Sequence, residues 1–421
     1  MLIEFALKNF RSFRGEQRLS LVAGPGKEMR AENSFHSTAR GTPDLLRSTA
    51  VYGANAAGKS NLLRGLQQMQ SIVLTSATGS QQGEVLPYTP FAFSADSRTA
   101  SSEFEVLFVE EGVRYQYGFS FDAERIHAEW LLAFPLGQAQ RVYERRYDEV
   151  GKRYDWHFSS GFKGNKKIWQ ETTRDNALFL STAVQLNSER LLPVFRWFQR
   201  RLVVITGNVA MNQHLTLKQL EDPVGRQKVM NLLRCADLGI VDVEVRRDSV
   251  LGAPPPEVAR AIGGPLPMAK LEVLSISSLH RAADDQSMVA LPIGEESQGT
   301  QHLFSSAGAW LNVLEKGEVL LYDEIDTSLH PLMVRFLVKQ FHTQATNPDN
   351  AQLVFTTHDV TMLDDRELFR RDQVWFAEKN EKGESSIYPL TDFSPRQPEA
   401  IGKRYLRGSY GAIPLLRTLG R

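Results

Sequence analysis

The chain has 421 residues with 49 basic and 49 acidic side chains, and this balance excludes a global electrostatic attraction to nucleic acid. Its one cysteine, Cys235, excludes an intramolecular disulfide and a cysteine-rich metal site. No apolar run approaches the roughly 18 residues of a membrane span, and the first residues lack a signal-peptide pattern, so we expect a cytoplasmic protein without a membrane partner.

The first part of the chain alternates between apolar and polar residues. Residues 1–10 and 18–23 repeat this pattern on either side of Gly15, which predicts an opening β-hairpin. Residues 24–47 are rich in Gly, Pro and Ser and carry no clear period. We therefore expect a loop that leads to a short strand at 48–52.

A phosphate-binding pattern, G-x-x-x-x-G-K-[ST], follows this strand. It reads Gly53-Ala54-Asn55-Ala56-Ala57-Gly58-Lys59-Ser60, and the apolar spacing of residues 61–69 predicts a helix directly after it. In this setting the loop N–H groups and the helix N-terminus bind phosphate, Lys59 reaches the terminal phosphates, and the Ser60 hydroxyl binds Mg²⁺. We predict a nucleoside triphosphate site that includes Asn61, with Lys59 also acting in catalysis.

The middle of the chain changes from strands to helices. Two-residue alternation from about 102 to 158 predicts an antiparallel β-meander, whereas the apolar spacing of 171–236 suits helices rather than strands. Residues 141–167 hold eight basic and four acidic residues, a local excess of about +4, with tyrosines and Trp156 among them. This stretch is either a solvated strand face or a surface that binds nucleic acid or a partner.

A buried strand is predicted at 318–324, and it ends in Asp323 and Glu324. Many nucleoside triphosphatases hold Mg²⁺ with the first acid of such a pair and activate water with the second. We predict that Asp323 coordinates the metal through water and that Glu324 is the general base. The alternative is a strand that ends in acidic helix caps.

Two further motifs flank this strand. Upstream, Ser297-Gln298-Gly299 precedes an apolar helix at 303–314, where Ser297 and Gly299 either bind a γ-phosphate or cap the helix. Downstream, the apolar run 351–357 ends at His358, which is either a γ-phosphate sensor or a structural histidine. The order of the motifs along the chain favours the functional interpretation of both.

These motifs resemble those of a known group of ATPases. In chain order they are Lys8-Asn9-Phe10-Arg11-Ser12-Phe13, the 53–60 loop, Ser297-Gln298-Gly299, Asp323-Glu324 and His358. The set resembles the ABC ATPase heads of the SMC, RecF and OLD group. This resemblance implies an α/β fold, an ABC-ATPase head with a P-loop core, an antiparallel β subdomain and a mainly helical insertion.

The resemblance also implies how the parts are divided and assembled. The expected domains are 1–135 and 295–421, the two parts of the head, with an insertion or lid at 136–294. Arg11 and Ser12 join the nucleotide-binding residues. In a head-to-head dimer, Ser297 and Gly299 of one copy would face the ATP and Mg²⁺ bound by the other.

A closer resemblance is to the RloA- or AbiL-like ATPases of bacterial antiphage defence operons. It rests on the opening residues 3–23, Glu129-Trp130-Leu131, residues 176–181 and the tail from Tyr405 to Pro414. It implies an ATPase that acts as the sensor or regulatory subunit of an abortive-infection complex and controls a separately encoded effector such as a nuclease. The segment Ser297-Gln298-Gly299 departs from the signature of these ATPases, which reads Ser-Gly-Gly. The sequence also contains no heptads long enough for an SMC coiled coil.

Two other functions fit the same motifs. One is a RecF-like DNA repair ATPase, for which turnover would be stimulated by DNA. The other is an oligomeric scaffold that binds ATP but hydrolyses little of it, although a scaffold has no need for a base such as Glu324.

Overall fold

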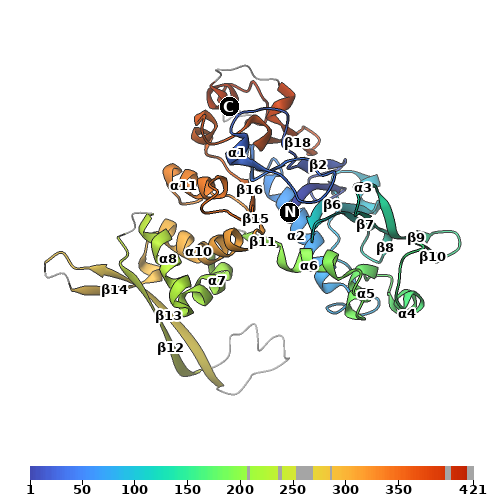
Figure 1. Cartoon of the computed structure of the whole chain (residues 1–421), viewed down its shortest axis with the longest axis horizontal. Helices are drawn as coiled ribbons and strands as arrows, with labels where there is room; N and C mark the ends of the chain where they lie inside the picture. The colour runs from blue at the N-terminus through green and yellow to red at the C-terminus, as the bar shows by residue number, and fades with distance from the viewer. Residues whose placement is uncertain (206–208, 236–238, 253–268, 285–286, 394–399, 415–421) are drawn as a thin grey trace, which may run out of the picture. The chain divides into compact units, whose positions relative to one another are not determined.

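This computed structural model describes residues 1–205, 209–235, 239–252, 269–284, 287–393 and 400–414. The expected mixed α/β fold is confirmed, and the chain divides into two compact units, Met1–Gly207 with Val313–Arg421, and Asn208–Asn312 (Figure 1). This division differs from the boundaries expected at 135 and 294, because residues 140–205 complete a sheet and its helical cover in the first unit. None of the described helices is long and apolar enough to cross a membrane.

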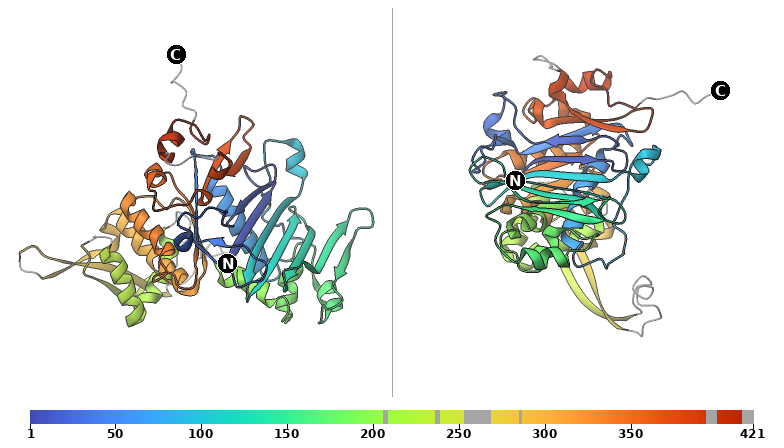
Figure 2. Two further views of the ribbon diagram at one scale, coloured as in Figure 1. Left: turned by 45° about the horizontal axis from the view of Figure 1, so that its top comes forward. Right: turned by 90° about the vertical axis from the view of Figure 1, so that its right-hand side faces the viewer.

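The first sheet of unit 1 is antiparallel and has seven strands in the order β10-β9-β8-β7-β6-β1-β2. The strands are β1 (Leu2–Lys8), β2 (Gln17–Ser20), β6 (Ser102–Glu110), β7 (Val113–Phe121), β8 (Ile126–Phe134), β9 (Gln140–Asp148) and β10 (Arg153–Phe158). They run side by side, blue to green, in the right-hand view of Figure 2. The predicted hairpin and meander are both confirmed, and β1 joins them by pairing with β2 and β6.

The second sheet of unit 1 carries the predicted strand at the P-loop. Its order is β11-β15-β16-β5-β17-β18, with β11 (Leu202–Ile205), β15 (Val319–Tyr322), β16 (Gln352–Thr356), β5 (Ser48–Gly53), β17 (Val374–Lys379) and β18 (Ser385–Pro389). All neighbours are parallel except β17 and β18. The prediction of helices throughout 171–236 was wrong at β11, whose four apolar residues pair with β15 and are too few to show a period.

Helix α2 (Lys59–Thr75) continues from the P-loop and packs into the core of unit 1. Its buried side chains include Leu62, Leu66 and Met69. At Gly65 the helix lies so close to β1 that an added Cβ would meet the Leu7 side chain at 3.0 Å. The other helices of this unit are α1 (Arg30–Asn33), α3 (Ala95–Thr99), α4 (Lys166–Thr172), α5 (Phe179–Gln185), α6 (Leu192–Arg200), α11 (Pro331–His342) and α12 (Ile401–Leu406).

A buried carboxylate explains why α5 belongs to the first unit. Glu129 on β8 is fully buried and forms an ion pair with Arg145 of β9 at 3.1 Å. It also accepts hydrogen bonds from the backbone N–H groups of Phe179 and Leu180, at 2.7 and 2.9 Å. These bonds satisfy the free donors at the start of α5 and stabilise the negative charge. Two of the stretches that carry the defence-ATPase resemblance therefore meet here.

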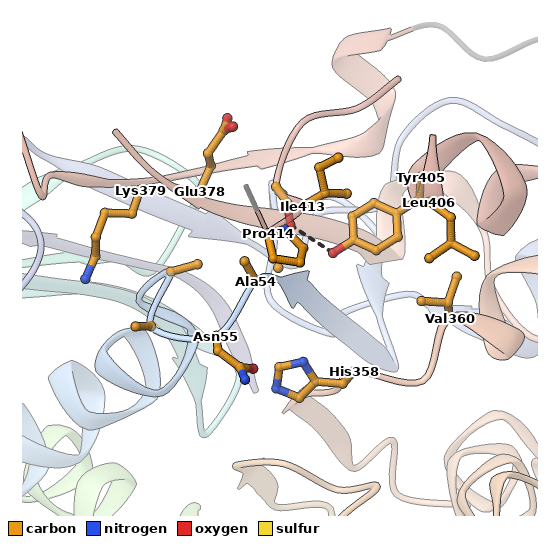
Figure 3. Close-up of a pocket in the computed structure, with 14 residues that line it drawn as sticks. Ala54, Asn55, His358, Val360, Glu378, Lys379, Tyr405, Leu406, Ile413 and Pro414 are labelled. Atoms are coloured by element: carbon orange, nitrogen blue, oxygen red, sulfur yellow. Dashed lines mark hydrogen bonds between the residues drawn. The ribbon is translucent and has the colours of Figure 1, made fainter. Parts of the chain in front are cut away.

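The last described segment packs on β17. The ring of Tyr405 stacks on Phe376 at a centroid distance of 5.3 Å, and its hydroxyl donates to the carbonyl of Ala412 at 3.0 Å (Figure 3). Tyr410 stacks on the same phenylalanine at 5.6 Å. Residues 401–414 are thus held beside the strand that neighbours β5.

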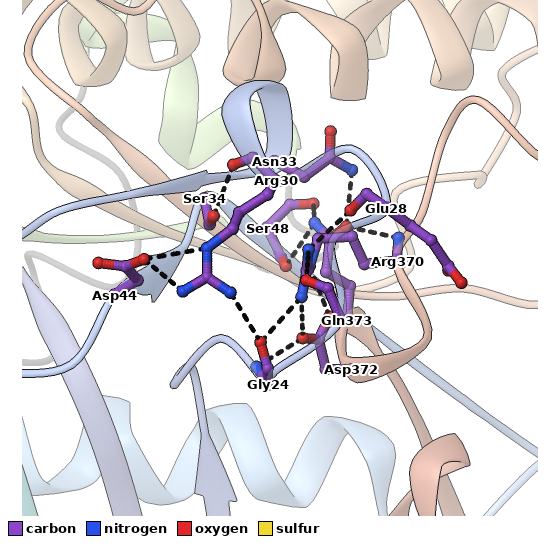
Figure 4. A network of polar contacts seen from close by, with 11 residues as sticks. Gly24, Glu28, Arg30, Asn33, Ser34, Asp44, Ser48, Arg370, Asp372 and Gln373 are labelled. Carbon is purple, nitrogen blue, oxygen red and sulfur yellow. Dashed lines mark hydrogen bonds and ion pairs between the residues drawn. The ribbon is translucent and has the colours of Figure 1, made fainter. Parts of the chain in front are cut away.

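A network of polar contacts orders much of the stretch expected to be a loop at 24–47 (Figure 4). Arg370 is 2% exposed, pairs with Asp372 at 2.7 Å, and donates to the carbonyl of Gly24 at 3.2 Å. Gln373 accepts from Asn33 at 2.7 Å. The stretch also contains the short strands β3 (Ser34–Phe35) and β4 (Leu45–Leu46), which pair with each other.

Unit 2 combines helices with an antiparallel sheet. Its elements are α7 (Val209–Glu221), α8 (Pro223–Cys235), β12 (Asp242–Gly252), β13 (Ala269–Arg281), β14 (Met288–Pro292) and α10 (Gln298–Lys316), and the boundary at 312 falls within α10. The strands are ordered β12-β13-β14. Thr216 of α7 bonds directly to α10, accepting from the N–H of Gly308 at 2.9 Å and donating to the carbonyl of Phe304 at 2.9 Å.

Candidate active site

The predicted strand–loop–helix around the phosphate-binding pattern is present. Strand β5 ends at Gly53, and α2 begins at Lys59. Gly58 has φ 111°, and an added Cβ there would meet Ser385 Oγ at 2.6 Å and Ser12 Oγ at 3.0 Å. A side chain at Gly53 would overlap the carbonyl oxygen of Ala377. Both glycines are therefore required by the path of the backbone.

Lys59 points back over the loop that precedes it. The residue is 5% exposed, and its ammonium donates to the carbonyls of Gly53 at 2.9 Å and Ala54 at 3.1 Å. Burial lowers the pKa of Lys59 below its usual 10.5, while the negative charges of Glu324 and Asp323 oppose the shift. A partly desolvated cation of this kind is well placed to bind a phosphate group.

Asp323 follows β15 and collects hydroxyl groups from two other elements. Its Oδ1 accepts from Ser60 Oγ at 3.0 Å and from Thr356 Oγ1 at 2.7 Å. One carboxylate and one hydroxyl are a donor set that suits Mg²⁺ when nucleotide phosphates supply further oxygens. Among the described residues no group of three or more His, Cys, Asp or Glu side chains is placed to hold a metal. Ser60 and Asp323 together therefore fit a metal ion that binds along with its nucleotide.

Glu324 lies in a strained turn and does not cap a helix. It has φ 54°, a region that costs a residue with a side chain about 1 kcal/mol or more. Its backbone N–H donates to Thr356 Oγ1 at 2.7 Å, which holds the turn in place. The next helix, α11, begins only at Pro331 and is capped by His330. The alternative of an acidic helix cap thus does not apply to Glu324.

His358 follows β16 and lines the same pocket as Glu324. Its backbone N–H donates to Asp326 Oδ2 at 3.1 Å. Burial and then the positive charge of Lys59 lower the pKa of the His358 imidazole below 6.5, against the opposing charges of Asp326 and Glu324. The neutral ring, with one donor and one acceptor nitrogen, is therefore the dominant form at neutral pH.

These residues surround a pocket of 340 Å³. It is lined by Asn55, Ala56, Ala57, Gly58, Lys59, Ser60, Asn61, Arg64, Glu324, His358 and Lys379. Arg64 and Lys379 were missed in the sequence. Arg64 lies one helical turn after Ser60, a spacing that could have identified it, whereas Lys379 comes from the distant strand β17 and carries no local signal.

Arg11 and Ser12 lie next to the first turn of α2. Ser12 Oγ accepts from the side-chain amide of Asn61 at 3.0 Å, and the Ser12 carbonyl accepts from the N–H of Ser385 at 2.7 Å. Burial lowers the pKa of Arg11, and the positive charge of Arg64 lowers it further. Two guanidinium groups that repel each other beside the P-loop helix suit an anionic ligand.

Ser297 and Gly299 belong to unit 2, whereas the residues that line the pocket all belong to unit 1. Ser297 Oγ accepts from the N–H of Thr300 at 3.1 Å and shares a second hydrogen bond with Thr300 Oγ1 at 2.8 Å. The capping interaction that the sequence left open is therefore present at the start of α10.

The first residues of the P-loop also line a second pocket, of 610 Å³ (Figure 3). Its far side is largely apolar and comprises Val360, Tyr405, Leu406, Ile413 and Pro414. Asn55, His358 and Lys379 line both pockets.

The basic stretch at 141–167 is extensively paired with acids. Arg141 and Arg146 both bind Glu144, at 2.9 and 2.5 Å, and Lys152 lies 3.7 Å from Glu149. These pairs are exposed or half-exposed, so each contributes little to stability. They nevertheless reduce the free positive charge, which favours a solvated strand face over a nucleic-acid surface.

Thr356 is a further residue that the sequence did not single out. Its hydroxyl donates to the Asp323 carboxylate and accepts from the Glu324 backbone N–H. We expect Thr356→Val to lower the turnover number for ATP about tenfold or more, because it removes hydrogen bonds to Asp323 and to the Glu324 N–H. Steady-state phosphate release tests this. Thr356→Ser, which keeps the hydroxyl, is the control and should retain most of the activity. Equal turnover in the two variants would contradict the role given to Thr356.

Comparison with known protein families finds a match that covers the motifs of this site. The family model "AAA domain, putative AbiEii toxin, Type IV TA system" matches residues 48–163 and 273–364, a span that includes the P-loop, Ser297, Asp323 and His358. No curated protein matches the chain.

Several solved SMC head structures are similar to the chain. One is an SMC head bound to the C-winged helix domain of ScpA (13% identity, TM-score 0.41, 94% of this chain and 99% of that chain covered). Another is the SMC head domain from Thermotoga maritima (14%, 0.37, 92% and 98%). A third is the SMC head with an extended coiled coil, bound to the C-terminal domain of ScpA derived from Pyrococcus furiosus (12%, 0.38, 93% and 97%). The family match covers both segments that carry the ordered motifs, and it supports the resemblance of this chain to AAA-type ATPases.

Proposed function

We propose that the chain binds ATP with Mg²⁺ and hydrolyses it to ADP and phosphate. The observation that carries this proposal is a connected set of hydrogen bonds: Ser60 and Thr356 donate to Asp323, and the Glu324 N–H donates to Thr356, beside a pocket lined by Lys59, Ser60 and Glu324. A structural role would not need a strained glutamate beside a buried, partly desolvated lysine.

Each residue then has a defined task in hydrolysis. Lys59 and the loop N–H groups hold the β- and γ-phosphates, and Ser60 with Asp323 would hold Mg²⁺, which neutralises phosphate charge. Glu324 accepts a proton from the water that attacks the γ-phosphorus, and the bond from that phosphorus to the bridging oxygen of ADP breaks. The neutral His358 ring donates a hydrogen bond to a γ-phosphate oxygen.

The active form in this proposal is a head-to-head dimer. Ser297 and the backbone at Gly299 of one copy reach the γ-phosphate held by Lys59 of the other. Support comes from the position of Ser297 at the start of the long helix α10, whose first N–H groups point toward any anion placed there. The cap at Thr300 keeps the hydroxyl at the helix end until nucleotide arrives.

The biological role that we propose is the ATP-dependent sensor of an antiphage defence complex, in which the ATPase controls a separately encoded effector, such as a nuclease. Support comes from the match to the family described as "AAA domain, putative AbiEii toxin, Type IV TA system", and from the stretches of the sequence that resemble AbiL- and RloA-like ATPases. Purification from its native host and identification of the proteins that remain bound would test this role. The RecF-like alternative predicts DNA-stimulated turnover without any such partner.

Ser297→Arg tests the dimer. We expect this variant to bind ATP as the wild type does but to lose ATP-driven association, because the bulky cation would occupy the position of the opposing phosphate. Light scattering with and without ATP measures association, and calorimetry measures binding. Ser297→Ala is the comparison variant: it removes the hydroxyl, and with it a cap worth roughly 1 kcal/mol of stability, but adds no cation, so it should impair association less than Ser297→Arg. Undiminished ATP-dependent association of Ser297→Arg would show that Ser297 does not face nucleotide.

A further inference from the structure

The residue before Ser297 connects α10 to the sheet of unit 2. Glu296 Oε1 accepts from Ser278 Oγ at 2.5 Å and lies 2.6 Å from His280 Nε2, both on β13. Ser278 is fully buried, and the Glu296 side chain is 10% exposed. A hydrogen bond between such buried partners, one of them a carboxylate, is stronger than an exposed neutral one.

The backbone around Glu296 is fixed from the helix side as well. The side-chain amide of Gln301 donates to the carbonyl of Glu296 at 2.7 Å and to that of Gly294 at 3.0 Å. Ser297 Oγ accepts from the N–H of Thr300. The short segment 294–297 therefore has one set of bonds to the first turn of α10 and another to β13, with Glu296 common to both.

We propose that Glu296 is a positioning residue, whose bonds to β13 fix the position of the adjacent Ser297. The inference rests on the proposed function, in which Ser297 faces the nucleotide of a second copy. Because both bonds of the carboxylate go to one strand, a displacement of β13 moves Glu296, and the adjacent Ser297 moves with it. Strands β12 and β13 are paired along eleven residues from Asp242 to Gly252. A displacement of this strand pair would therefore be transmitted to Ser297.

Neighbouring glutamates make a matched experiment possible. Glu295 is exposed and lies on the short 3₁₀ turn Ile293–Glu295, one residue before Glu296. We expect Glu296→Ala to lower the turnover number at saturating ATP about tenfold or more and to weaken ATP-driven association, because two bonds to a carboxylate are lost. ATP affinity of the monomer should stay unchanged, since it depends on unit 1. Glu295→Ala should behave as the wild type, and Glu296→Gln, which keeps an acceptor oxygen, should recover much of the activity.

A readout without nucleotide separates this inference from the proposed function. In the apo protein, hydrogen exchange at the amides of residues 297–301 should be faster in Glu296→Ala than in Glu295→Ala, with thermal melting to confirm that both variants fold. His280→Ala added to Glu296→Ala should change exchange little further, because the two residues share one interaction. If the wild type neither hydrolyses ATP nor associates, the proposed function fails while faster exchange would still support the positioning of Ser297. Exchange and turnover in Glu296→Ala equal to those in Glu295→Ala would overturn the inference.

Discussion

Lys59→Ala is expected to abolish ATP binding at concentrations that saturate the wild type. Its ammonium is the cation that the P-loop presents, held by the carbonyls of Gly53 and Ala54 and largely removed from water. Removal of one partner from a desolvated charge pair costs about 2–5 kcal/mol, which corresponds to roughly a 30-fold to several-thousand-fold loss of affinity. Calorimetry with a non-hydrolysable ATP analogue and Mg²⁺ measures this loss.

The same substitution should leave the fold intact. Burial already disfavours the Lys59 charge in the free protein, as its lowered pKa shows, so its removal relieves a desolvation cost while it breaks two hydrogen bonds. Lys379→Ala is the matched control, because this lysine lines the same pocket but is exposed and comes from β17. It should weaken binding far less. Equal affinities of Lys59→Ala and wild type for the ATP analogue would contradict the proposed nucleotide site.

Local patterns made the central part of this site predictable. The elements of the phosphate-binding loop are close together in sequence: strand β5, Gly53, Gly58 and the start of α2. The backbone at Gly53 and Gly58 requires glycine, because a Cβ there would overlap neighbouring atoms. The opening hairpin and the meander were predictable for the same reason, because antiparallel neighbours are joined by short connections and alternate with period two.

The parts that could not be predicted depend on contacts between distant residues. Thr356 is one of two adjacent threonines, and only the pairing of β15 with β16 shows which hydroxyl reaches Asp323. Lys379 reaches the pocket because β17 pairs with β5. Strand β11 has four residues and depends on β15 for its existence as a strand. No periodicity in the sequence contains this information.

The division of the chain was also set by long-range contacts. The change from a strand-like pattern, which ends at about 158, to a helix-like pattern over 171–236 suggested a helical insertion, but Glu129 binds the start of α5 and so retains that helix in unit 1. A buried carboxylate with a guanidinium and two helix N–H groups as partners cannot be recognised from a strand pattern, in which Glu129 looks like an ordinary polar position.

Glu324→Gln is expected to separate ATP binding from hydrolysis. The amide keeps the size of the side chain and can still hold the attacking water, but it cannot accept a proton from it. Loss of a general base typically costs on the order of 100-fold or more in rate. The backbone contributions to this turn, the φ of 54° and the bond from the Glu324 N–H to Thr356, are unaffected by the substitution. The variant should therefore bind ATP normally and accumulate as an ATP-bound dimer.

Single-turnover hydrolysis measures the chemical step directly and is unaffected by slow product release. The informative comparison is with Asp326→Asn. Asp326 is a second acid in the same loop, and its carboxylate accepts a hydrogen bond from the His358 backbone N–H. If Glu324 is the base, its amide variant loses far more of the single-turnover rate than Asp326→Asn, while both keep their affinity for ATP. A Glu324→Gln rate within about threefold of wild type would mean that another group activates the water. Since His358 is neutral at the pocket edge, its imidazole would then be the next residue to test as that base.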